Sequence, residues 1–204
     1  MRFQNYIWDF DGTLYDSYDG MADAFLLALQ EFGVVKEKRE VYRLMKKESV
    51  RFATHHYVGV ERQQALMDRY HEIEARRLRP PNPFPETKAM LEAIKAYGGR
   101  HFVLTHRDQS AIDFLKEDGL FPLFTDFVTE NLGFQRKPHP ESLLFLLEKH
   151  QLKAEDTVMI GDRLLDVLAG KNAGVSTILY DIDGFLGEIP ADYTVHALDE
   201  ILKI

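Results

Sequence analysis

The chain has 204 residues, of which 45% are apolar and 28% charged, and its formal net charge is -8. This composition is typical of a globular protein with one sizeable core and a small inserted domain, and the negative charge excludes a general attraction to nucleic acid or to an anionic membrane surface. The absence of cysteine excludes disulfides, cysteine-ligated zinc and thiol catalysis, and because no apolar run has the length of a signal-peptide core or a membrane span, we expect a cytoplasmic protein.

The first predicted element is a short buried strand at residues 6–8, which runs directly into the sequence DFDGT at residues 9–13. Residues two apart on an extended backbone point to the same side, so Asp9 and Asp11 are expected to face one reacting centre. Gly12 permits a tight turn and a close approach of the backbone to a ligand. The segment therefore predicts a catalytic or metal-binding strand end.

A helical insertion follows, because residues 16–79 show helical periodicity and no convincing strand. Thr13 is a candidate N-cap, and the first helix should end near Gly33. We expect residues 16–83 to form a mobile all-helical cap, and residues 1–15 and 84–204 to form the α/β core. The first predicted helix carries an apolar stripe from Met21 to Phe32, and further helices are predicted at 38–47, 51–57 and 61–78. A stiff proline-rich linker at residues 80–85 closes the insertion.

Strands and helices alternate in the rest of the chain. Short apolar runs predict buried parallel strands, and the helical patterns between them begin near Gln109, Pro140 and Leu164. This alternation is typical of a doubly wound, Rossmann-like parallel sheet, whose ligands bind beyond the carboxyl ends of the strands. The predicted strands are 101–105, 157–161, 176–180 and, with a weaker pattern, 126–129.

Two further positions after these strands offer phosphate-binding groups. Thr105 ends a predicted strand, where a hydroxyl backed by the amides of the next turn can hold a phosphoryl oxygen; the alternative is a helix cap. Lys137 lies in a loop before a helix and can neutralise a phosphate and a carboxylate; the alternative is an ordinary surface lysine. His106 is a candidate for substrate contact, or else a solvated loop histidine.

The strongest internal strand is followed by Gly161-Asp162-Arg163-Leu164-Leu165-Asp166. Carboxylates at a strand end and in the first helical turn suit a hard cation that prefers oxygen ligands. Capping of the helix N-terminus is the alternative for Asp166.

A second Asp-x-Asp-Gly pattern occurs at residues 181–184. It carries Phe185 where the first copy has Thr13, and little chain follows it from which to build a matching site. We interpret it as an acidic loop at a strand end.

The order of Asp9-x-Asp11-Gly12-Thr13, Thr105, Lys137 and Gly161-Asp162-x-x-x-Asp166 resembles the four motifs of the haloacid dehalogenase-like hydrolase superfamily, in its helical-cap subclass. The resemblance implies an aspartyl-phosphate intermediate on Asp9, with Asp11 as general acid and base. Thr105 and Lys137 would hold the phosphoryl group. Asp9, the backbone carbonyl of Asp11, and Asp162 would bind Mg²⁺, with Asp166 acting behind these ligands.

Asp11 also distinguishes two branches of the superfamily, because the dehalogenases lack this second aspartate. The overall pattern is most similar to the phosphoglycolate phosphatase-like group. Many relatives place Asn after the threonine or serine of the second motif, whereas this chain has His106-Arg107.

The predicted cap contains a basic cluster within an acidic protein: Arg43, Lys46, Lys47, Arg51 and His55. Arg43, Lys47 and Arg51 are candidates for binding a carboxylate or second anion of the substrate. The alternative is a solvated helix face.

The sequence thus predicts an Mg²⁺-dependent phosphatase that acts on a small phosphorylated metabolite. A phosphomutase of the β-phosphoglucomutase type shares the motifs and remains an alternative. A non-catalytic binding module that retains the scaffold is the second alternative.

Overall fold

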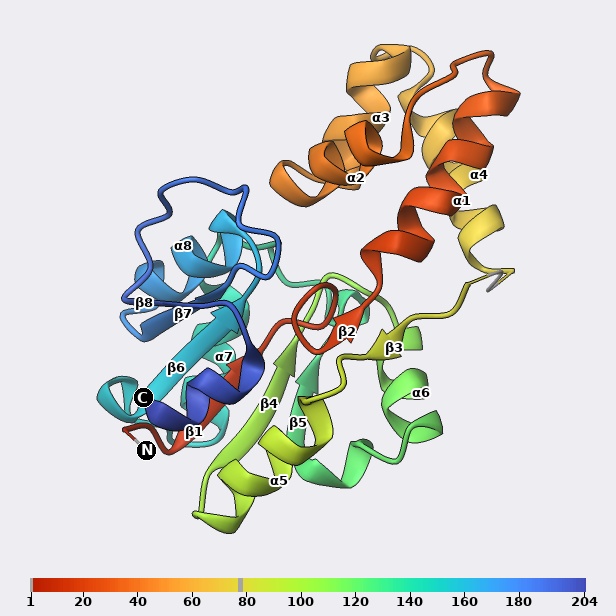
Figure 1. Cartoon of the computed structure of the whole chain (residues 1–204). Helices are drawn as coiled ribbons and strands as arrows, with labels where there is room; N and C mark the ends of the chain where they lie inside the picture. Colours follow the sequence, from red (N-terminus) through yellow and green to blue (C-terminus); the bar gives the residue numbers. More distant parts are fainter. Residues whose placement is uncertain (1, 77–78) are drawn as a thin grey trace. The chain divides into compact units, whose positions relative to one another are not determined.

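The computed structural model describes residues 2–76 and 79–204, and the chain divides into two compact units (Figure 1). The core unit comprises Met1–Tyr15 and Pro83–Ile204, and the helical unit comprises Asp16–Asn82. The second boundary lies one residue earlier than expected. That the helical unit acts as a mobile cap stays a prediction.

One sheet of six parallel strands organises the described part of the core unit (Figure 1). The first strand of the chain lies at its centre, which confirms the predicted doubly wound parallel sheet. In spatial order the strands are β5 (Phe124–Val128), β4 (Arg100–Leu104), β1 (Asn5–Trp8), β6 (Thr157–Gly161), β7 (Ser176–Tyr180) and β8 (Tyr193–Val195).

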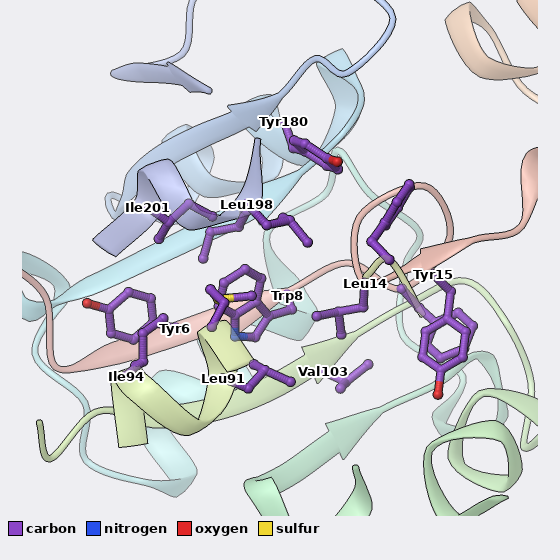
Figure 2. Close-up of a cluster of buried hydrophobic side chains, with 14 of the residues drawn as sticks. Tyr6, Trp8, Leu14, Tyr15, Leu91, Ile94, Val103, Tyr180, Leu198 and Ile201 are labelled. Carbon is purple, nitrogen blue, oxygen red and sulfur yellow. The ribbon is translucent and has the colours of Figure 1, made fainter. Parts of the chain in front are cut away.

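Helices cover both faces of this sheet, because alternate side chains of each strand point to opposite faces. Tyr6 and Trp8 pack in the cluster that Figure 2 shows, together with side chains of α5, α6 and the C-terminal 3-10 helix. Ile7 packs on the other face with side chains of α7 and α8. The helices of the core unit are α5 (Thr87–Ala96), α6 (Ser110–Glu117), α7 (Glu141–Lys149) and α8 (Leu164–Asn172), with 3-10 helices at Phe121–Leu123, Glu130–Leu132, Ala154–Asp156 and Leu198–Lys203.

The central strand is fixed by a buried polar chain as well as by apolar packing. The Trp8 indole N–H donates to Nδ1 of His101 at 3.0 Å, and Nε2 of His101 lies 3.0 Å from the carbonyl oxygen of Leu91. Burial lowers the pKa of His101 to about 4, so the ring is neutral at pH 7 and can accept on one nitrogen and donate from the other. β1 is therefore held to both β4 and α5.

The helical unit has its own apolar core, formed by the inward faces of its helices. Gly33 follows the first helix with φ of +77°, as the helix-end prediction requires. The helices are α1 (Tyr18–Glu31), α2 (Lys38–Lys47), α3 (Val50–Val58) and α4 (Gln63–Glu74).

Several local predictions were wrong. The last helix ends at Glu74 instead of Leu78, because the N–H of Arg76 bonds to the carbonyl of Ile73 and tightens the final turn; residues 77–78 lie outside the described residues. The linker at 80–85 contains the short strand β3 (Asn82–Pro83), which pairs with β2 (Tyr15–Asp16).

Among the α-helices and the strands of the six-stranded sheet, α5 and β8 had no predicted counterpart. β8 spans only Tyr193–Val195, whereas α5 has ten residues. In the described residues no helix combines the length and apolar character that crossing a bilayer requires.

Candidate active site

Three of the predicted site residues directly follow three neighbouring strands of the sheet. Asp9 directly follows β1, Thr105 follows β4 and Asp162 follows β6. The chain leaves β1 toward β4 and leaves β6 toward β7, so the sheet order reverses between β1 and β6. Ligands of doubly wound sheets bind at such a switch point, and Asp9 and Asp162 flank it.

The loop after β1 is tighter than an extended strand. β1 ends at Trp8, and the carbonyl of Phe10 accepts from the N–H groups of Leu14 and Tyr15. Gly12 has φ of +76°, which glycine adopts without strain. β1 thus ends before Asp9 and the chain turns at Gly12, and that Asp9 and Asp11 face one reacting centre stays a prediction.

Two further predictions for this loop concern Gly12 and Thr13. The N–H of Gly12 donates to the carbonyl of Tyr15 at 2.8 Å, so this amide is engaged within the loop and its contact with substrate stays a prediction. The N-cap of α1 is Ser17, whereas Thr13 is fully buried and its hydroxyl caps no helix.

A buried cation joins two of the predicted carboxylates. Nζ of Lys137 lies 2.7 Å from Oδ1 of Asp9 and 2.6 Å from Oδ1 of Asp166. It also donates to the carbonyl of Leu104 at 3.2 Å. The side chains of all three charged residues are at most 2% exposed, so the surface-lysine alternative for Lys137 is wrong.

Burial and the neighbouring charges shift both pKa values. Burial raises the pKa of Asp9 to about 6 and Asp166 adds to the rise, while Lys137 and Arg163 oppose it. Burial by itself lowers the pKa of Lys137, but Asp166 and Asp9 more than offset this, so its pKa lies above the ordinary value. Lys137 is therefore charged at pH 7 and stabilises the ionised carboxylates.

The same end of the sheet has the oxygen ligands for a metal ion. Asp9, Asp162 and Asp166 are all buried and each offers a carboxylate oxygen, with these atoms within 4.8 Å of one another. Oδ2 of Asp9 is buried and has no hydrogen-bond partner among the described residues. Buried carboxylate oxygens suit a hard divalent cation, so the donor set fits a metal ion.

Asp166 both caps a helix and joins the buried cluster. Its Oδ2 accepts from the N–H of Arg163 at 3.1 Å, at the start of α8. A Cβ on Gly161 would lie 2.3 Å from Cβ and Cγ of Asp166, which is closer than real Cβ atoms approach. Only glycine at 161 therefore allows Asp166 to pack against the end of β6.

The Asp11 carboxylate pairs with the side chain of Arg107, to which the sequence interpretation gave no role. Nε of Arg107 lies 3.1 Å from each carboxylate oxygen of Asp11, and Nη2 lies 2.8 Å from Oδ1. This is a two-pronged guanidinium–carboxylate contact. That the Asp11 carbonyl binds metal stays a prediction, since the carboxylate cluster consists of other residues.

The loop after β4 places two further predicted residues. Oγ1 of Thr105 accepts from the N–H of Arg107 at 3.0 Å, and α6 begins at Ser110, so Thr105 does not cap that helix. Nε2 of His106 accepts from the backbone N–H of Lys137 at 2.8 Å. Burial lowers the pKa of His106 to about 2, so the ring is neutral and holds the Lys137 loop instead of being solvated.

The candidate anion-binding residues of the helical unit do not all lie together. Arg43 and Lys47 line a groove of about 590 Å³ with Arg39 and His56, and Arg51 is outside its lining. A role for Arg43, Lys47 or Arg51 in binding substrate stays a prediction.

Arg107, Gly161 and Arg163 are the residues near the carboxylates to which sequence reasoning assigned no role. Arg107 directly follows His106, which stands where many relatives have Asn after the threonine or serine of the second motif, and this neighbouring departure was its only signal. Gly161 had a weaker one as a glycine directly before a strand-end aspartate. The sequence showed no partner for Arg163.

Comparison with known proteins identifies the family. Residues 6–180 match the family model for haloacid dehalogenase-like hydrolases. A phosphoglycolate phosphatase of Vibrio parahaemolyticus is 29% identical over 126 residues, which is 59% of this chain and 55% of that protein. A glyceraldehyde 3-phosphate phosphatase of Methanocaldococcus jannaschii is 32% identical over 143 residues, 66% of this chain and 60% of that protein. In matches such as the first, the chain spans about half the length of the curated relative.

Solved structures of other proteins are similar to this chain over its whole length. A hydrolase from Streptococcus pneumoniae is 35% identical, with a TM-score of 0.69 and full coverage of both chains. A structure from Lactobacillus plantarum shares the fold at 17% identity, with a TM-score of 0.88 over 100% of this chain and 99% of that chain. The chain therefore belongs to the haloacid dehalogenase-like hydrolase family, as the order of its four motifs predicts.

Proposed function

We propose that the protein is an Mg²⁺-dependent phosphatase that hydrolyses a small phosphomonoester through a covalent aspartyl phosphate on Asp9. The observation that carries this proposal is the environment of Asp9 at the switch point. One carboxylate oxygen accepts from Lys137, and the other is buried with no hydrogen-bond partner among the described residues. The second oxygen therefore has no hydrogen bond that would have to break before it attacks phosphorus.

In the first step Oδ2 of Asp9 attacks phosphorus and the bond from phosphorus to the ester oxygen breaks. Asp11 donates its proton to that oxygen, so that a neutral alcohol leaves. Lys137 and the Thr105 hydroxyl hold the phosphoryl oxygens and reduce the repulsion between the phosphate and the Asp9 carboxylate.

In the second step the Asp11 carboxylate takes a proton from water while the water oxygen attacks phosphorus. The bond between Asp9 and phosphorus breaks, which releases inorganic phosphate. Asp9 is then a free carboxylate again, and Asp11 carries the proton taken from water. Asp9 and Asp162 would hold Mg²⁺, with Asp166 positioned behind them by Lys137 and the N–H of Arg163. The cation would supply charge neutralisation between the phosphate and the carboxylates.

The relatives support a phosphomonoester as substrate without naming it. Two of them are named for phosphomonoesters, phosphoglycolate and glyceraldehyde 3-phosphate, while a Bacillus mycoides protein 25% identical over the full chain is named a pyrophosphatase, whose substrate, pyrophosphate, is a phosphoanhydride. The cytoplasmic location stays a prediction.

The first test is phosphate release from these three compounds and a panel of sugar phosphates, with Mg²⁺ and with EDTA. We expect release in Mg²⁺ and none in EDTA, and a phosphorylated Asp9 in the peptide mass spectrum of the acid-quenched reaction. Transfer of phosphate between sugar hydroxyls with no release would favour the mutase. Neither release nor transfer, with no phosphorylated Asp9, would contradict the proposal and favour the non-catalytic module.

A further inference from the structure

The Arg107 guanidinium contacts the Asp11 carboxylate through two of its nitrogens. Three donor–acceptor distances between the guanidinium and the two carboxylate oxygens lie between 2.8 and 3.1 Å. The side chains are 13% and 17% exposed. A contact from two nitrogens fixes both the place and the plane of a carboxyl group, which a single hydrogen bond does not do.

The backbone of Arg107 is fixed by the elements that carry the active site. Its N–H donates to Oγ1 of Thr105 at 3.0 Å, and its carbonyl accepts from the N–H of Glu130 at 3.0 Å. The guanidinium carbon lies 5.9 Å from the centre of the Phe10 ring. Phe10 is fully buried and stacks on Tyr15 at 4.3 Å. Arg107 is thus held by the β4 loop and by the loop that contains Asp11.

A second two-pronged pair in the helical unit provides a comparison. Nε and Nη2 of Arg69 lie 2.6 and 2.7 Å from the two carboxylate oxygens of Glu31, and these side chains are 26% and 48% exposed. That pair joins α4 to the end of α1. The Arg107–Asp11 pair instead joins a strand-end loop to a carboxyl group with a proposed role in proton transfer.

We propose that Arg107 is a positioning residue that orients the Asp11 carboxyl group for proton transfer to the leaving alcohol and from the attacking water. This inference rests on the proposed function. Arg107 acts through Asp11 and not on the transferred phosphoryl group. The loss of rate without Arg107 therefore depends on how much the leaving group needs a proton. The loss should be large for an alkyl ester and small for an aryl ester, whose leaving anion is stable.

The experiment compares kcat/KM for two esters, because this constant reports steps up to the first irreversible one. The probes are the alkyl phosphomonoester hydrolysed fastest in the panel above and 4-nitrophenyl phosphate. The variants are Arg107→Ala, Arg107→Lys and the matched Arg69→Ala, with Asp9→Asn as the control for the proposed function. Thermal unfolding establishes that each variant is folded.

We expect Arg107→Ala to lower kcat/KM for the alkyl ester by about tenfold or more, since general acid catalysis contributes on the order of 10²–10⁴. For 4-nitrophenyl phosphate the loss of kcat/KM should be below about threefold, because its stable leaving anion does not need a proton. Arg107→Lys should restore part of the alkyl rate, because an ammonium replaces the charge but not the two-pronged contact. Arg69→Ala should leave both rates unchanged.

The Asp11→Asn background tests whether Arg107 acts through Asp11. If it does, adding Arg107→Ala to Asp11→Asn should change the alkyl rate by less than about twofold, because contacting residues that act together are not additive. Equal losses on both esters, a change in KM alone, a gain in rate, or additive losses would each overturn the inference. Failure of the proposed function is recognised separately, by wild type that releases no phosphate or by Asp9→Asn that retains its rate; it would overturn the inference too.

Discussion

Two loops of the core unit share the pattern Asp-x-Asp-Gly directly after a buried parallel strand. One begins at Asp9 after β1, the other at Asp181 after β7. Each begins with a buried aspartate whose N–H donates to the neighbouring strand, from Asp9 to Ile160 at 2.8 Å and from Asp181 to Val195 at 2.9 Å. The closing glycine has φ of +76° in the first loop and +64° in the second. The two loops thus share these backbone features.

The side chains of the two loops have different partners. Oδ1 of Asp181 accepts from the N–H of Gly184 at 3.0 Å, so the second loop closes on itself. Oδ1 of Asp9 accepts from Nζ of Lys137 at 2.7 Å, and Lys137 is 128 residues away in the chain. A local turn satisfies Asp181, whereas a distant buried cation holds Asp9.

The position of each strand in the sheet explains this difference. β1 lies between β4 and β6, and each of these is followed directly by a predicted site residue, Thr105 and Asp162. β7 lies between β6 and β8, beyond the point where the strand order reverses. The same four-residue pattern therefore forms a candidate site where its strand flanks the reversal of strand order, and not one strand beyond it.

The largest expected effect is on the first loop. Asp9→Asn keeps the size of the side chain but removes the nucleophile, so we expect kcat to fall at least about a thousandfold. The measurement is phosphate release from the best substrate of the panel, with thermal unfolding as the control for folding. A folded variant with near-wild-type kcat would falsify the role of Asp9.

Lys137→Met removes the cation that distinguishes the two loops. It leaves Asp9 and Asp166 buried without their shared partner, and we expect a loss of about 3–5 kcal/mol in the free energy of unfolding. The measurement is urea unfolding in EDTA. As a matched control, Lys171→Met removes the exposed ion pair with Asp192 and should cost less than about 1 kcal/mol. Equal losses in the two variants would contradict the buried pairing.

Gly161→Ala tests the packing that brings Asp166 to the first loop. The added Cβ would lie 2.3 Å from Asp166, so Asp166 must move; we expect a loss of about 1–3 kcal/mol and a clear fall in kcat. Gly170→Ala is the control, because its Cβ would lie 2.5 Å from Cγ2 of Thr177, within α8 and β7. The control should lose stability but keep the kcat of its folded fraction.

The pH dependence of stability tests the burial of Asp9. Its pKa is raised from 3.8 to about 6 on folding, chiefly by burial, so between these values the folded protein binds more protons than the unfolded chain. Wild type should therefore lose up to about 2 kcal/mol relative to Asp9→Asn as the pH rises through this window. Urea unfolding of both proteins in EDTA at pH 4, 5, 6 and 7 measures the difference. A difference that does not vary with pH would contradict the shift.

The smallest expected effect is on the second loop. Asp181→Asn retains an oxygen that can accept from the N–H of Gly184, so stability should change by less than about 0.5 kcal/mol. Phosphate release should equal that of wild type. A large loss of activity would mean that the two loops are functionally linked, which their strand positions do not predict.

The sequence by itself determined the elements that recur with a clear period. β6 and β7 have the predicted bounds, and so does α2, because each is a short apolar run or an amphipathic stripe that local sequence specifies. Strand ends were readable to within one residue, since β4 ends at Leu104 and β5 at Val128 where the sequence predicts 105 and 129. Asp9, Thr105 and Asp162 were found in this way, since the ends of neighbouring parallel strands meet at one edge of a sheet. Short elements such as β8 were missed because three residues carry too little pattern.

Only the tertiary structure decided how the side chains pair. The Arg107–Asp11 contact joins residues 96 apart in the chain, and the contact of His106 with Lys137 joins residues 31 apart. Such pairings depend on which loops the sheet places side by side, and local periodicity carries no information about them. The close packing of Asp166 on Gly161 depends in the same way on a gap of ångström size, which exists only once α8 has packed against β6.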